Sequence, residues 1–103
     1  MAKLIRGLNV ILTDIDGRPI LANSNSKDEL KVKTVLVSLL INRKVDVLDS
    51  LKSYDLATKI FGFDKDEIEL DDTDFLFIKK AVEDNGVGYF AGIIGQIYKL
   101  LLN

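Results

Sequence analysis

The segment 86–103, GVGYFAGIIGQIYKLLLN, is the most apolar run of the chain and the feature that most constrains its fold. Its large apolar residues recur at steps of three and four, which places them along one stripe of a helix. Other elements have to cover that stripe, so we expect the rest of the chain to pack around this helix. The residues of the stripe are Phe90, Ile93, Ile94, Ile97, Leu100 and Leu101.

Three glycines form a second, smooth face along the same predicted helix. Gly88, Gly92 and Gly95 are spaced at i, i+4 and i+7. A glycine inside a helix costs up to about 1 kcal/mol relative to alanine, so three of them indicate that another backbone packs close by. That backbone belongs either to the same chain or to a second copy, so the three glycines are a candidate oligomer seam. We discount a membrane helix, because Gln96 and Lys99 interrupt a run shorter than the roughly 20 residues that a bilayer requires.

The composition indicates one globular domain, residues 1–103, without catalytic or redox chemistry. The chain has 103 residues, of which 48% are hydrophobic and 29% are charged. It has no histidine and no cysteine, so neither a Ser/His/Asp nor a Cys/His arrangement can be built. We therefore expect a non-enzymatic protein with no cofactor and no metal. The start, MAKLIRGLNVIL, lacks the features of a signal peptide, so the expected compartment is the cytoplasm.

The fold class that the elements predict is α+β, mostly helical, with a β-hairpin in residues 1–22 and a helical body in 29–103. The β-type run 8–12 leads into Asp16-Gly17 and a second apolar stretch. An Asp-Gly pair between two such runs is a strong hairpin signal, because glycine adopts the positive φ of a tight turn. The polar residues 22–28 predict a loop.

The helical body is expected to hold about four helices and one or two short extra strands. Apolar spacing predicts a helix over 32–41 and another from about 46 to 61 that ends at Gly62. A short strand in which Ile68 and Leu70 share a face precedes a third helix, which Asp71 or Asp72 caps. The extended pieces around 29–31 and 66–68 are predicted to be neighbours. In the second helix the predicted inward side chains are Leu48, Leu51, Ala57, Ile60 and Phe61, with Tyr54 at the boundary.

The motif VILTDIDG, residues 10–17, looks like the nucleophile loop of haloacid dehalogenase-type phosphatases. In that family the first aspartate, here Asp14, attacks phosphorus, and the second, here Asp16, is the acid/base, with magnesium nearby. The chain departs from the pattern at Arg18-Pro19, and it is too short for the doubly wound sheet that positions the remaining family residues. We therefore interpret the motif as a hairpin turn.

Acidic residues gather between positions 64 and 74. Helix capping explains the last three, because carboxylates favour the positive end of a helix dipole. The others form a candidate docking surface for a basic protein partner, with a solvated surface and a weak hard-cation site as alternatives. Nucleic-acid binding is not expected, since the net charge is −2. The predicted partner-binding residues are Asp64, Asp66, Glu67 and Glu69.

The layout of the whole chain resembles small accessory proteins of tailed phages and prophages. The resemblance rests on LTD-x-DG-x-PI, VLVSLL, YDLATKI, EIELDDTDFLFIKKAV and GQIYKLLLN, in that order. It implies a phage accessory context. From the absent catalytic groups, the glycines of the last helix and the acidic residues, we expect a homodimer or small oligomer that binds another macromolecule. In a phage setting that partner is a host or viral protein, with inhibition of a host defence or replication factor as the leading version. The alternatives are a virion assembly component and a protein that sequesters a nucleotide through Lys31, Lys33, Arg43 or Lys44.

Overall fold

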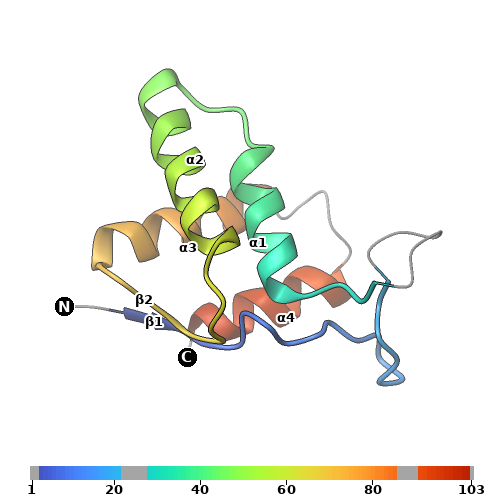
Figure 1. Ribbon diagram of the computed structural model, residues 1–103. Helices are drawn as coiled ribbons and strands as arrows, with labels where there is room; N and C mark the ends of the chain where they lie inside the picture. Colours follow the sequence, from blue (N-terminus) through green and yellow to red (C-terminus); the bar gives the residue numbers. More distant parts are fainter. Residues whose placement is uncertain (1–2, 22–27, 86–90, 103) are drawn as a thin grey trace.

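Four helices and a short antiparallel sheet make up the described part of the computed structural model, which comprises residues 3–21, 28–85 and 91–102 (Figure 1). This arrangement confirms the predicted fold class, α+β and mostly helical. The helices α1 and α2 stand side by side as a hairpin, and the sheet and α4 lie below it in Figure 1. The elements are β1 (Lys3–Ile5), α1 (Val32–Ile41), α2 (Val47–Phe61), β2 (Ile68–Leu70), α3 (Asp72–Asn85) and α4 (Ala91–Leu102).

The centre of the core is α1 and not the C-terminal helix. Half of the residues of α1 are buried, and they lie on the stripe that helical spacing predicts. In α4 only Ile97 and Leu101 are fully buried, while Ile93, Ile94 and Leu100 pack against the core in part. Phe90 lies outside the described residues. The prediction that the chain folds around segment 86–103 is therefore wrong, although the apolar stripe of α4 does face the core. The buried residues of α1 are Val32, Val35, Leu36, Leu39 and Leu40.

The face that α2 buries matches the predicted one only in part: Ala57 and Ile60 are buried, as predicted. Its buried face combines the small residues Ser53 and Ala57 with two large ones, and the Ser53 hydroxyl donates a hydrogen bond to the Leu40 carbonyl of α1. Because serine and alanine are small, they let α2 approach α1 closely. Leu48, Leu51 and Phe61, predicted to face inward, are instead exposed. The buried set is Ser53, Leu56, Ala57 and Ile60.

Side-chain caps fix the starts of α2 and α3 at the residues that the sequence predicts. The Asp46 carboxylate accepts a hydrogen bond from the Asp49 amide at 2.9 Å, and the Asp71 carboxylate accepts one from the Asp74 amide at 2.8 Å. Each cap satisfies an amide that the first helical turn leaves unpaired. At the other end of α2, Gly62 is the C-cap, as predicted.

The sheet joins the N-terminal segment to a strand in the second half of the chain. β1 is antiparallel to β2, with Lys3 opposite Leu70 and Ile5 opposite Ile68. Ile68 and Leu70 are both buried, which confirms that they share a face. The predicted pairing of 29–31 with 66–68 is wrong, because residue 29 instead bridges Leu21 and residue 31 bridges residue 11.

The Asp-Gly turn forms as predicted. The Asp14 amide donates to the Arg18 carbonyl at 2.9 Å, Thr13 bridges Pro19, and Gly17 has φ +85°. The flanks of this turn pair at an isolated bridge and not along a continuous ladder. The segment is instead held against residue 30, because the Leu12 amide donates to that carbonyl at 2.7 Å. The extended N-terminal part of the chain therefore packs along the start of α1.

Candidate functional site

The helix α2 exposes a row of large apolar side chains on the side away from the core. We call this row the α2 face. Its members recur at helical steps, and their exposed fractions range from 62% to 85%. Thr58, also exposed, fills the gap in the row, and its hydroxyl donates back to the Tyr54 carbonyl at 2.9 Å. The α2 face consists of Val47, Leu48, Leu51, Tyr54 and Phe61.

Mixed charges border the α2 face. Asp55 and Lys59 are exposed beside it, and Lys52 forms an ion pair with Asp74 of α3 at 3.4 Å. A hollow of about 420 Å³ lies between these charges and Leu48 and Leu51. The surface is thus an apolar strip with charges of both signs along one margin, the composition found at protein interfaces with a polar rim.

An exposed strip of this kind is unfavourable unless something covers it. Removing a large apolar side chain from water contributes about 1.5–3 kcal/mol. Single exposed apolar residues are ordinary on a protein surface, but contiguous ones mark interaction sites. Ile15, at the tip of the Asp-Gly turn, is such a single exposed apolar residue, because it is fully exposed and belongs to no apolar row.

The cations predicted to meet a nucleotide do not converge on one site. Lys31 and Lys33 lie at the start of α1, and Arg43 and Lys44 lie beyond its end, a separation of about 15 Å along a ten-residue helix. Lys33 donates to the Phe63 carbonyl.

Arg43 instead joins the end of α1 to α3. Its guanidinium lies 5.0 Å from the centroid of the Phe77 ring, and its Nη2 is 3.9 Å from Asp84. The side chain is only 8% exposed, and its Nε and Nη1 atoms have no hydrogen-bond partner. The guanidinium is therefore a packed part of the α1–α3 contact, where the cation–π interaction compensates in part for the missing acceptors.

Two of the four predicted acidic binding residues are engaged within the chain. The Asp66 carboxylate accepts a hydrogen bond from the Asn9 amide at 2.9 Å, and Glu67 pairs with Arg6 at 3.3 Å. Both contacts hold the N-terminal segment beside β2. Asp64 and Glu69 are exposed. A role for these carboxylates in partner binding stays a prediction.

The glycines of α4 have no neighbouring backbone in the described structure. Gly92 and Gly95 are exposed, and a Cβ atom added at either position would meet nothing within 4 Å. The interpretation that they allow close packing inside the chain is therefore wrong for these two, and the seam with a second copy stays a prediction. Gly88 lies outside the described residues. This part of α4 is bonded to the N-terminal segment through Gln96, whose side-chain amide donates to the Thr13 carbonyl at 2.7 Å.

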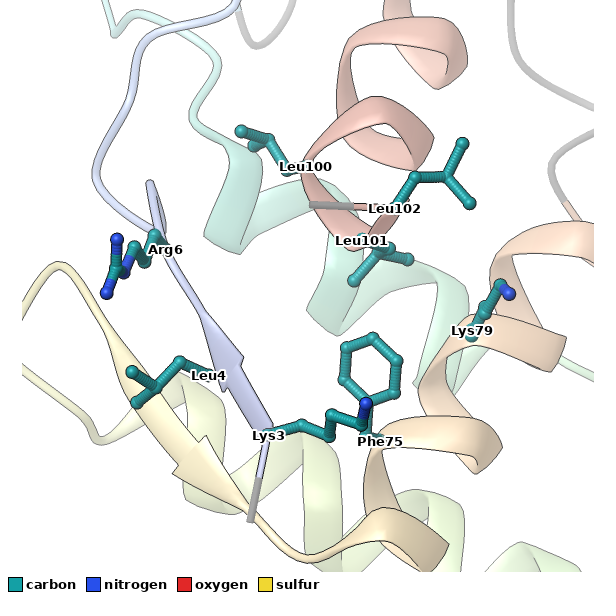
Figure 2. Close-up of a pocket in the computed structure, with 8 residues that line it drawn as sticks. All are labelled: Lys3, Leu4, Arg6, Phe75, Lys79, Leu100, Leu101 and Leu102. Carbon is teal, nitrogen blue, oxygen red and sulfur yellow. The ribbon is translucent and has the colours of Figure 1, made fainter. Parts of the chain in front are cut away.

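A cavity of about 770 Å³ lies where β1, α3 and the end of α4 meet (Figure 2). Phe75 and Leu101 point toward one another across its interior, and Lys3 reaches in from β1 (Figure 2). Sequence reasoning missed this cavity, because its parts come from both ends of the chain and from α3. Its lining residues are Lys3, Leu4, Arg6, Phe75, Lys79, Leu100, Leu101 and Leu102.

Asp14 and Asp16, the two aspartates of the phosphatase-like motif, lie in the exposed turn. The Asp14 carboxylate accepts hydrogen bonds from the amides of Asp16 and Arg18, at 2.9 and 3.0 Å. These bonds give the first aspartate a structural role in the turn. Within residues 3–21, 28–85 and 91–102, no three acidic side chains are grouped so that they could hold a metal ion.

None of the helices in the described ranges is long and apolar enough to cross a membrane. Comparison with protein-family models, with curated proteins and with solved structures gives no match to this chain.

Proposed function

We propose that the protein acts without catalysis, by binding another protein through the α2 face. The observation that carries this proposal is the row of five large apolar side chains, 62% to 85% exposed, along one side of a single helix. No described element covers the row, although the other side of the same helix is fully packed. Such an asymmetry is typical of a helix that has one partner inside the domain and a second outside it.

The spacing of the row favours a helix as the bound element. Val47, Leu51, Tyr54 and Phe61 follow one another at steps of four, three and seven. Steps of three and four are the pattern by which side chains of one helix insert between those of another. The partner would present an amphipathic helix, with charges of both signs opposite Asp55 and Lys59.

The expected affinity is moderate. Five side chains at about 1.5–3 kcal/mol each contribute roughly 8–15 kcal/mol of gross stabilisation. Association costs about 4–15 kcal/mol, so the balance is favourable only for a partner whose shape matches the strip closely.

The resemblance of the chain layout to phage accessory proteins supports a host protein as that partner, with inhibition of a defence or replication factor as the consequence. Co-purification with capsid or tail proteins would instead indicate a role in virion assembly. In either setting the binding surface is the same helix face.

A pair of matched variants tests the proposal. Leu51→Asp places a charge at the middle of the α2 face, and Ile15→Asp makes the same type of change at an isolated exposed residue. We expect affinity-tagged Leu51→Asp to lose the proteins that the wild type retains from infected cells, and Ile15→Asp to keep them. Equal retention by both variants, each with a wild-type circular dichroism spectrum, would refute the proposal.

A further inference from the structure

We propose that the cavity between β1, α3 and α4 binds an amphipathic anion, specifically an aliphatic carboxylate such as a medium-chain fatty acid. This site is separate from the α2 face, because the two share no lining residue. Its volume, about 770 Å³, falls within the range of roughly 300–1,000 Å³ typical of small-molecule sites.

The apolar part of the cavity lining comes from leucine and phenylalanine side chains. Leu101 is almost completely buried and Phe75 is half-buried, while Leu102 and Leu4 are exposed toward its edges. In Figure 2 the side chains of Phe75 and Leu101 lie between the strand and α3, and Leu102 extends from the last turn of α4 on the side of Lys79. A hydrocarbon tail laid over these groups would gain about 25 cal/mol for each Å² that it buries.

The charged side chains among the described lining residues are all basic. Lys3, Arg6 and Lys79 line the cavity, and none of its described lining residues carries a carboxylate side chain. Arg6 is neutralised by Glu67 at 3.3 Å. In the described part of the chain, neither Lys3 nor Lys79 has an ion-pair partner. Two ammonium groups without an ion-pair partner among the described residues thus border apolar side chains, which favours a ligand with an anionic head group and an apolar tail.

The hydrogen-bonding character of the lining narrows the ligand class further. Its side chains are leucine, phenylalanine, lysine and arginine, so they offer donors and no acceptors. A carboxylate has only hydrogen-bond acceptors, which match the lysine donors of the lining. An aliphatic tail needs no hydrogen-bond partner.

Calorimetric titration of the full chain with decanoate, below its micelle concentration, tests the inference. Acetate supplies the head without the tail, and decyltrimethylammonium supplies the tail with the opposite charge. We expect heat from decanoate alone. No heat from decanoate, or equal binding of the cationic amphiphile, would overturn the assignment.

Two charge-reversal variants on α3 locate the site. Lys79→Glu should weaken decanoate binding by about tenfold or more, whereas Lys80→Glu, the same change at the next and exposed position, should leave it within about twofold. Leu102→Asp, at an exposed position of the cavity edge, should also weaken binding. Equal affinities of Lys79→Glu and Lys80→Glu would place binding elsewhere. Leu51→Asp should bind decanoate like the wild type, which separates this result from any failure of the α2 face.

Discussion

Small residues decide how the helices of this protein approach one another. Ser53 is a buried polar side chain, and its hydroxyl finds an acceptor in the Leu40 carbonyl. The serine hydroxyl supplies this carbonyl with a hydrogen-bond donor at a position where water does not reach it. Because serine is small, it also lets α1 and α2 lie close together. The same helix carries Leu51 two residues earlier, and that leucine faces solvent.

Removing the Ser53 hydroxyl should destabilise the fold modestly. Ser53→Ala leaves the Leu40 carbonyl short of a partner, which we expect to lower the free energy of unfolding by about 1 kcal/mol. Ser53→Leu should cost more, about 1–3 kcal/mol, because the larger side chain overpacks the α1–α2 contact. Urea denaturation measures both. Ser50→Ala, at an exposed hydroxyl of the same helix, is the control and should change stability less.

The exposed glycines of α4 should tolerate a side chain. Because a Cβ at Gly92 or Gly95 meets nothing within 4 Å, we expect Gly92→Ala to raise the free energy of unfolding by about 0.5–1 kcal/mol. Gly7→Ala is the contrasting variant: its φ is +89° and its Cβ would lie 3.3 Å from Leu100, so it should destabilise.

The seam prediction has its own test in the same helix. Loss of an oligomer in sedimentation of Gly92→Leu, with the helical content retained, would support a seam between copies. Destabilisation by Gly92→Ala would instead mean that the helix face is covered within the chain.

At the scale of elements, the positions of the helices follow from the sequence and the orientation of α2 does not. The range of α1 and the end of α2 at Gly62 match the predictions, because apolar spacing and caps are local signals. The sequence of α2 has large apolar residues on two sides, so periodicity alone cannot say which side is buried. The useful signal was the pair of small residues Ser53 and Ala57, which point to a close helix contact.

A hydrogen bond between α3 and α4 makes the junction of these helices sensitive to pH. The Tyr98 hydroxyl donates to the Glu83 carboxylate, and this bond raises the pKa of Tyr98 above its ordinary value of 10.0. Since the folded-state pKa is raised, the stabilisation is fully present below the unfolded pKa and is lost as the pH rises through the folded one.

Glu83→Gln tests that contact. We expect the pKa of Tyr98, followed by ultraviolet titration of tyrosinate, to fall toward its ordinary value in this variant, because the carboxylate acceptor is gone. Tyr54→Phe is the control, since it removes an exposed tyrosine and should leave the titration of Tyr98 unchanged. An identical Tyr98 titration in Glu83→Gln and in the wild type would contradict the assignment.

At the scale of the whole molecule, the two candidate surfaces differ in how far a sequence can reveal them. The α2 face lies within one helix, and three of its residues, Leu48, Leu51 and Phe61, were predicted to face the core. That prediction is wrong because an apolar stripe has the same sequence pattern whether the domain or a partner protein covers it. The cavity draws on Lys3, Phe75, Lys79 and Leu101, which only the fold brings together. Pairing of β1 with β2 is what carries the N-terminal lysine to α3.

The α2 face also makes a prediction about the isolated chain. If the row is exposed in the monomer, Leu51→Asp should change the free energy of unfolding by no more than about 0.5 kcal/mol, as expected for a surface substitution. Ile97→Asp, at a fully buried position of α4, should cost several kcal/mol and abolish cooperative unfolding. A comparable loss in both variants would mean that α2 is buried by something in the free protein.

The central claim, that the α2 face meets a protein partner, is tested most directly by photocrosslinking in cells that produce the protein, with a photoreactive residue in place of Leu51. We predict one discrete crosslinked product from this position, and no product from the same residue placed at exposed Lys80 on α3. The absence of a product at Leu51, or the same product from both positions, would contradict it.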